Sequence, residues 1–185
     1  MKVAILVEGK NEREFLENLI NHLGFDSKKA VFYHFSGKSN FFDLSYKIYN
    51  ELIPQIASDQ IDKVLFVVDA DDTNSDRIHG GFSNTQIALD QIINQLGIKN
   101  ISRTYIMCDP ATKTGYLESF ILSTIPADQK SCIDAFLECS QFESKHLHKV
   151  ILNKIYYLAY PKYPFDFLHP NFDSLKAVLT DLLIN

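Results

Sequence analysis

The sequence predicts an α/β fold in which helices cover both faces of a central parallel sheet of about four strands, followed by a C-terminal helical extension. Short apolar runs that suit buried strands alternate with segments of helical periodicity in the first part of the chain. Strand and helix follow each other three times before a fourth strand, which requires parallel pairing and right-handed crossovers. Only helical patterns come later. We therefore expect an α/β domain over residues 1–125 and a helical extension over residues 126–185, packed as one unit.

Four segments have the composition of strands. The third contains five consecutive apolar residues, three of them valine, which suits a strand that is buried on both faces. The four expected strands are Lys2–Val7, Ala30–Phe35, the apolar run that begins the stretch Lys63–Thr73, and Ile101–Met107.

Helices are expected between and after these strands. Asn11 with Glu14 resembles a capping box and begins a helix that ends near Leu23, and Ser83 with Gln86 begins another in the same way. The remaining helices are expected over residues 40–53, 115–122, 128–140, 145–160 and 172–184.

An acidic cluster follows the third strand. Asp69 and Asp71 come at its downstream end, and alternation along extended backbone would place both carboxylates on one side. Two such carboxylates repel each other unless a cation or a proton intervenes. Mg²⁺ is the natural candidate because hard cations prefer oxygen ligands. The alternative interpretation is a solvated acidic turn that ends the strand.

A second acidic strand end supports the metal hypothesis. Glu8 directly follows the first strand. If the sheet has the order 2-1-3-4, the first and third strands are neighbours at the topological switch point, where open α/β sheets bind their ligands. Glu8, Asp69 and Asp71 would then converge on one crevice.

Composition limits the classes of function. Apolar residues make up 46% of the 185 residues, which is typical of a globular chain, and the formal net charge of −5 gives no basic footprint for nucleic acid. The start of the chain has no secretory signal pattern, and no apolar run reaches membrane-spanning length. We expect a cytoplasmic protein that does not bind membranes.

The motifs Glu8-Gly9, Asp69-x-Asp71 and Gly115-x-Leu-Glu118 together resemble the Toprim domain of topoisomerases, bacterial primases, recombination proteins and OLD-family nucleases. In layout the chain looks most like a small stand-alone Toprim-like family of bacterial and archaeal proteins. The resemblance covers roughly the first 120 residues and implies a Toprim-like, Rossmann-like three-layer domain. No tyrosine can be assigned as a strand-passing nucleophile, so topoisomerase activity is not expected.

The resemblance also implies roles for individual residues. Glu8, Asp69 and Asp71 match the Mg²⁺-binding acids of Toprim enzymes, Glu12 matches the second acid of the E-G-x-x-E form in OLD-like nucleases, and Glu118 matches a later acidic motif. Five acids exceed the needs of one ion, so two Mg²⁺ or Mn²⁺ ions would use them better. Glu8 could be a ligand or the general acid or base. For Glu12 and Glu118 the alternative is an acid in a first helical turn that interacts favourably with the helix dipole.

Lysines could supply positive charge to a phosphoryl transition state. Lys10 and Lys38 follow the first and second expected strands on the crevice side, and Lys154 interrupts the apolar face of a late helix. Any of the three could contact phosphate. The alternative for each is a solvated surface lysine.

These features predict a Mg²⁺-dependent phosphoryl-transfer protein of Toprim type, most simply a nuclease or nucleic-acid-processing factor. One alternative is a metal- or nucleotide-binding accessory protein without turnover. A second is a haloacid-dehalogenase-like phosphatase with Asp69 as nucleophile and Asp71 as acid/base, since D-A-D-D-T fits that motif. That family carries the motif on its first strand and needs a later acidic pair, and this chain has neither.

Overall fold

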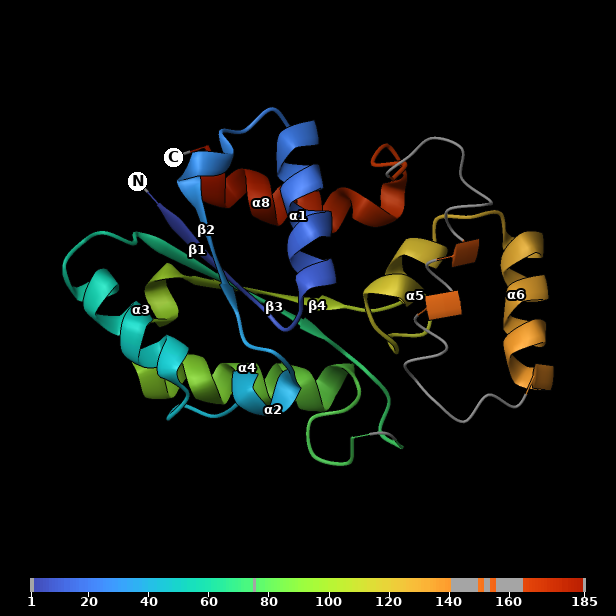
Figure 1. Cartoon of the computed structure of the whole chain (residues 1–185), viewed down its shortest axis with the longest axis horizontal. Helices are drawn as coiled ribbons and strands as arrows, with labels where there is room; N and C mark the ends of the chain where they lie inside the picture. Colours follow the sequence, from blue (N-terminus) through green and yellow to red (C-terminus); the bar gives the residue numbers. More distant parts are fainter. Residues whose placement is uncertain (1, 75, 141–149, 152–153, 156–164, 185) are drawn as a thin grey trace.

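The computed structural model describes the whole chain except residues 1, 75, 141–149, 152–153, 156–164 and 185 (Figure 1). Four strands form one sheet in the order β2-β1-β3-β4, and every neighbouring pair is parallel. The strands are β1 (Val3–Val7), β2 (Ala30–His34), β3 (Lys63–Asp69) and β4 (Ser102–Met107). The predicted fold class and strand order are therefore confirmed.

Helices lie on both faces of this sheet and give three layers (Figure 1). One face carries α1 and α8, and the other carries α2, α3 and α4, while α5 and α6 lie beyond the carboxyl ends of the strands. The helices are α1 (Lys10–His22), α2 (Lys38–Phe41), α3 (Lys47–Ala57), α4 (Phe82–Leu96), α5 (Leu117–Leu122), α6 (Ala127–Ser140) and α8 (Asp173–Leu183). The short 3₁₀ helices are η1 (Ser27–Lys29), η2 (Lys99–Ile101) and η3 (Pro170–Phe172). This arrangement is of the Rossmann-like kind.

Alternation along the central strands divides the core into two halves. Val3, Ile5 and Val7 of β1 pack in the half that contains α1 and α8, while Ala4 and Leu6 pack in the half that contains α3 and α4. Every residue of β1 is fully buried. Because both faces of β1 are covered, its sequence is continuously apolar rather than alternating.

Phe15 of α1 connects the first helix to the C-terminal part of the chain. Its ring lies 5.0–6.2 Å, centroid to centroid, from the rings of Phe120, Phe165, Phe167 and Phe172. Aromatic pairs at these distances contribute beyond the area that they bury. This aromatic group fixes α5 against α1. The division into residues 1–125 and 126–185 stays a prediction, although α8 shares one core with α1.

Two predicted helix starts are wrong. Helix α1 begins at Lys10 after Gly9, and no side chain caps it, so the expected Asn11–Glu14 capping box does not form. Helix α4 begins at Phe82 after Gly81, so Ser83 lies inside the helix instead of capping it. Gly81 has φ of +85°, a conformation that favours glycine and lets the chain turn sharply into α4.

The single helix expected over residues 40–53 is also wrong, because two helices, α2 and α3, occupy this region. The Asp43 carboxylate accepts hydrogen bonds from the main-chain N–H and the hydroxyl of Ser45. Such a local turn competes with helical hydrogen bonding and separates the two helices. The helix expected over residues 145–160 lies largely outside the described residues, whereas α8 matches its predicted range within one residue.

Within the described ranges, no helix combines the length and apolarity needed to cross a membrane.

The shared core predicts that α8 is required for stability. Leu179 is fully buried in the cluster that contains β1 and α1, so Leu179→Ala should lower the free energy of unfolding by about 2–5 kcal/mol in urea titrations. Ile184, at the end of the same helix, is 60% exposed, and Ile184→Ala should change stability by less than about 0.5 kcal/mol. Equal effects of the two substitutions would contradict this packing.

Candidate functional site

The carboxyl ends of β1 and β3 bring Glu8 and Asp69 together. The strands are parallel neighbours with Val7 opposite Val67, so Glu8 and Asp69 leave the same edge of the sheet. The Glu8 Oε1 atom accepts a hydrogen bond from the main-chain N–H of Asp69 at 2.9 Å. The expected convergence of these two strand ends is therefore present.

Asp69 links the sheet to α5 and so brings Glu118 to the same region. Its Oδ1 atom accepts a hydrogen bond from the main-chain N–H of Leu117 at 3.0 Å, at the start of α5. The neighbouring Glu118 accepts a hydrogen bond through Oε1 from the Asn11 side chain of α1 at 3.3 Å. Both Asp69 and Glu118 are 2% exposed. Asp69 and Glu118 are thus held near one another by contacts that connect three elements.

Asp71 is oriented by a turn and not by the pleat of a strand. Strand β3 ends at Asp69, and Asp71 has φ of +59°, in the left-handed region. Its main chain forms an isolated antiparallel bridge with Gly115, in which each residue donates its N–H to the carbonyl of the other. Asp69 and Asp71 therefore do not alternate along one extended strand as predicted, because extended backbone stops before Asp71.

Lys38 is buried behind the acidic turn. It is 9% exposed, although the sequence suggested a lysine that could reach phosphate or solvent. Its ammonium nitrogen contacts four oxygen atoms: Asp69 O at 2.8 Å, Ala70 O at 3.1 Å, Thr85 Oγ1 at 3.2 Å and Asp71 Oδ2 at 3.4 Å. Lys38 is thus an internal partner of the turn that carries Asp71.

Glu12 is also buried, with 5% of its surface exposed, on the first turn of α1. A β-carbon at position 9 would lie 2.6 Å from its Oε2 atom, so only glycine there lets the carboxylate fold back over the start of the helix. This close approach gives a physical reason for glycine directly after Glu8. Glu12 lies on the same helical turn as Asn11, which contacts Glu118.

The clustering of charge changes the acidity of Glu8. Burial, with a further contribution from the nearby Asp69 and Asp71 carboxylates, raises the pKa of Glu8 to about 8, against the opposing effects of Lys38 and of the Asp69 N–H. A carboxyl group with this pKa retains a proton at neutral pH in the metal-free chain. Glu8 can therefore change between the protonated and the charged form near neutral pH when the charge beside it changes.

The structure brings Glu8, Asp69, Asp71, Glu118 and Lys38 together at the ends of β1 and β3, and Glu12 lies on the first turn of α1. Lys154 is exposed and lies between ranges that are not described. Thr85, which is fully buried and contacts Lys38, was missed, because one threonine within a helical pattern carries no signal of a distant partner. Asn11 was expected to begin a helix and instead contacts Glu118.

The carboxylates fit a hard cation by their chemistry, since all are oxygen donors at one edge of the sheet. In the part of the chain that the structure describes, no three Asp, Glu, His or Cys side chains already surround a common metal position. Main-chain donors and Lys38 hold several of the carboxylates instead. Binding an ion would thus require side-chain rotation of acids whose backbone positions are already adjacent.

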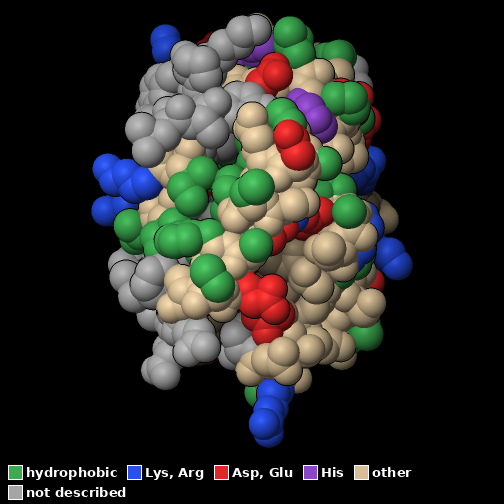
Figure 2. Space-filling model, turned by 90° about the vertical axis from the view of Figure 1, so that its right-hand side faces the viewer, with side chains coloured by type: hydrophobic (Ala, Val, Ile, Leu, Met, Phe, Trp, Pro, Cys, Tyr) green, Lys and Arg blue, Asp and Glu red, His purple; other side chains and the backbone are tan. Residues whose placement is uncertain are grey.

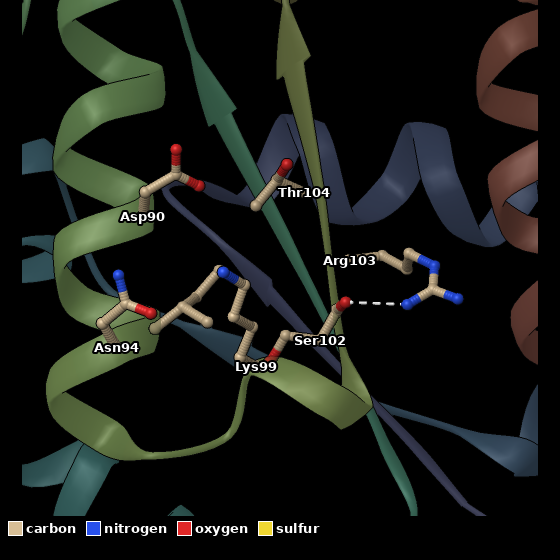
Figure 3. A pocket seen from close by; sticks show the side chains of 7 residues that line it. Asp90, Asn94, Lys99, Ser102, Arg103 and Thr104 are labelled. Carbon is tan, nitrogen blue, oxygen red and sulfur yellow. Dashed lines mark hydrogen bonds between the residues drawn. The ribbon is translucent and has the colours of Figure 1, made fainter.

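The surface around the strand ends is not basic. Figure 2 shows the end of the molecule toward which the strands run, with acidic side chains in the middle of the face and lysine and arginine side chains mostly at its margins. A separate cavity of about 420 Å³ lies between α4 and β4 and is lined by Asp90, Ile93, Asn94, Lys99, Ser102, Arg103 and Thr104 (Figure 3). None of the five acids lines it.

The fold and the site define an α/β protein with a buried acidic cluster at the topological switch point of a parallel sheet. A family model described as "Protein of unknown function (DUF3226)" matches residues 2–164, and the chain belongs to this family. No match was found among curated proteins or among solved structures.

The raised pKa of Glu8 predicts how stability depends on pH. Without metal, the folded state binds the Glu8 proton up to about pH 8, whereas the unfolded chain releases it near pH 4.5, so the folded state loses stability as pH rises through this window. Glu8→Gln removes this loss. Relative to wild type, the variant should gain about 1–3 kcal/mol between pH 5 and pH 9, after allowance for partial solvent screening.

Urea unfolding in EDTA at the two pH values measures this difference. Glu14→Gln, which neutralises an exposed acid of α1, is the matched control and should show little pH-dependent gain. A constant difference between Glu8→Gln and wild type at both pH values would contradict the raised pKa.

Proposed function

We propose that the protein is a Mg²⁺- or Mn²⁺-dependent phosphoryl-transfer protein of Toprim type that acts as a nuclease or nucleic-acid-processing factor in the cytoplasm. The observation that supports this best is the hydrogen bond from the Asp69 N–H to the Glu8 carboxylate. It brings together the two acidic strand ends at the position where open α/β sheets bind ligands. The order of the acidic motifs along the chain adds support through its resemblance to Toprim domains.

The metal ligands would come from the buried acids at the strand ends. Asp69 and Asp71 would hold the ion, with Glu118 supplied from α5 and Glu12 from α1. When bound, the ion would stabilise the negative charge that develops on a transferring phosphoryl group. The chain supplies the orientation, because the main-chain N–H of Leu117 and the ammonium of Lys38 fix one oxygen each of Asp69 and Asp71.

Glu8 is suited to exchange a proton. Its pKa of about 8 lies near neutral pH, which is where a general acid or base works best. In the metal-free chain the carboxyl group can hold a proton, and a cation bound beside Asp69 would favour its release. Glu8 is therefore proposed as either an acid/base group or an additional ligand.

A second candidate function is a metal-binding accessory protein without turnover. It is favoured by the acidic centre of the face in Figure 2 and by the burial of Lys38, which directs its ammonium group to protein oxygens. With a net charge of −5, the chain would need a partner that supplies positive charge to hold nucleic acid. The phosphatase alternative is weaker, because its nucleophile Asp69 is 2% exposed and bonded to the start of α5.

Cleavage assays distinguish these functions. Purified protein should cleave single- or double-stranded DNA or RNA in the presence of Mg²⁺ or Mn²⁺, and Asp69→Asn should lower the rate at least about 100-fold because a charged ligand is lost. Asp72→Asn removes an exposed acid three residues further along the chain and should leave the rate within about twofold.

Metal binding without cleavage of any of these polymers would favour the accessory function. Hydrolysis of p-nitrophenyl phosphate that is abolished by Asp69→Asn, without polymer cleavage, would favour the phosphatase. Cleavage that survives Asp69→Asn would contradict the proposed site.

A further inference from the structure

We infer that the Lys38 ammonium group takes the place of a second cation at the acidic cluster, so that the site accepts one divalent ion and not two. This inference rests on the metal binding proposed above. It differs from the two-ion arrangement that the number of acids alone suggests.

The position of Lys38 is set by the fold. The residue begins α2, after a short turn that follows β2, and its side chain extends to the end of β3. The preceding Gly37 donates its main-chain N–H to the carbonyl of Glu8, which fixes the start of α2 beside the end of β1. Lys38 therefore enters the acidic cluster from a segment that carries none of the acids.

Oxygen atoms surround the Lys38 ammonium group, as they would surround a bound metal cation. It contacts the main-chain carbonyls of Asp69 and Ala70, and its other two oxygen neighbours come from the Asp71 carboxylate and the Thr85 hydroxyl. An ammonium group has three N–H donors and no acceptor, so these contacts use its full capacity. Turning Lys38 away would leave buried carbonyl and carboxylate groups without this partner, which is unfavourable.

The engagement of the carboxylates also limits the number of ions. Four of the acids have one oxygen bonded to a protein donor: Glu8 Oε1 to the Asp69 N–H, Asp69 Oδ1 to the Leu117 N–H, Asp71 Oδ2 to Lys38 and Glu118 Oε1 to Asn11. A carboxylate that bridges two ions places one oxygen on each. As long as these four contacts are kept, none of the four carboxylates can bridge two ions, and Mg²⁺ completes its shell with water.

Electrostatic repulsion between the Lys38 ammonium group and a second divalent ion also favours a site with one ion. A second divalent ion on the Asp71 side would lie close to an ammonium group that is itself 3.4 Å from Asp71 Oδ2. Both groups are buried, with 9% and 7% of their side chains exposed, so solvent screens this repulsion poorly. Lys38 thus excludes the second ion while it stabilises the turn that carries Asp71.

Counting bound Mn²⁺ tests the inference without an activity measurement. The spectrum of free Mn²⁺ in electron paramagnetic resonance disappears on binding, and a titration of the wild-type chain should give one ion per chain. Lys38→Met should bind a second Mn²⁺, because the positive charge that repels a second ion beside Asp71 is lost. Lys10→Met removes an exposed lysine at the start of α1, beside the site, and should leave the count at one.

Each outcome has a distinct meaning. Two ions bound by wild type would overturn the inference and leave the proposed function standing, whereas no binding at all would contradict the proposed function itself. One ion in both wild type and Lys38→Met would overturn the role of Lys38. If Lys38→Met fails to fold by circular dichroism, Lys38→Gln supplies a second neutral variant, whose polar amide is less unfavourable than a thioether among the buried oxygens.

Discussion

The hydrogen bond between the main-chain N–H of Asp69 and the Glu8 carboxylate is the interaction on which the rest of the site depends. It connects the ends of two central strands whose parallel register is fixed by the core on both faces. From Asp69, a second hydrogen bond leads to the start of α5 and so positions Glu118. If either strand shifted by one residue, these acids would point to different layers of the fold.

The same cluster opposes the stability of the fold. Burial, and after it the nearby Asp69 and Asp71 carboxylates, raises the pKa of Glu8, and Lys38 together with the Asp69 N–H offsets only part of this effect. Asp71 also adopts a left-handed backbone conformation that residues other than glycine rarely adopt. Such departures from the most stable arrangement are expected where a protein binds or transforms a ligand.

The sequence predicted the fold well because the strands are buried on both faces. The continuous apolar run within Lys63–Asp69 is typical of a strand that is buried on both faces. The position of this strand in the sheet agrees with the order of strands and helices along the chain. The convergence of Glu8 with Asp69 also followed from this order. The predicted helix starts are wrong because α1 and α4 begin directly after Gly9 and Gly81 without a side-chain cap, and only Gly81 has a backbone conformation that favours glycine.

Other features depend on contacts that are distant along the chain. The burial of Lys38 arises from oxygens up to 47 residues away, including Thr85, and no local pattern marks such a partner. The orientation of Asp71 depends on its bridge to Gly115. Hydrophobic periodicity predicts which helices and strands form, whereas these tertiary contacts determine the orientation and burial of the acidic side chains.

A crystal structure of the protein soaked with Mn²⁺, with anomalous diffraction data, tests the central claim most directly. The account predicts one strong anomalous peak within bonding distance of oxygen atoms from both Asp69 and Asp71, with the Lys38 ammonium group still on its carbonyl partners. A map without any peak beside these carboxylates, from crystals that diffract well and contain saturating Mn²⁺, would contradict it.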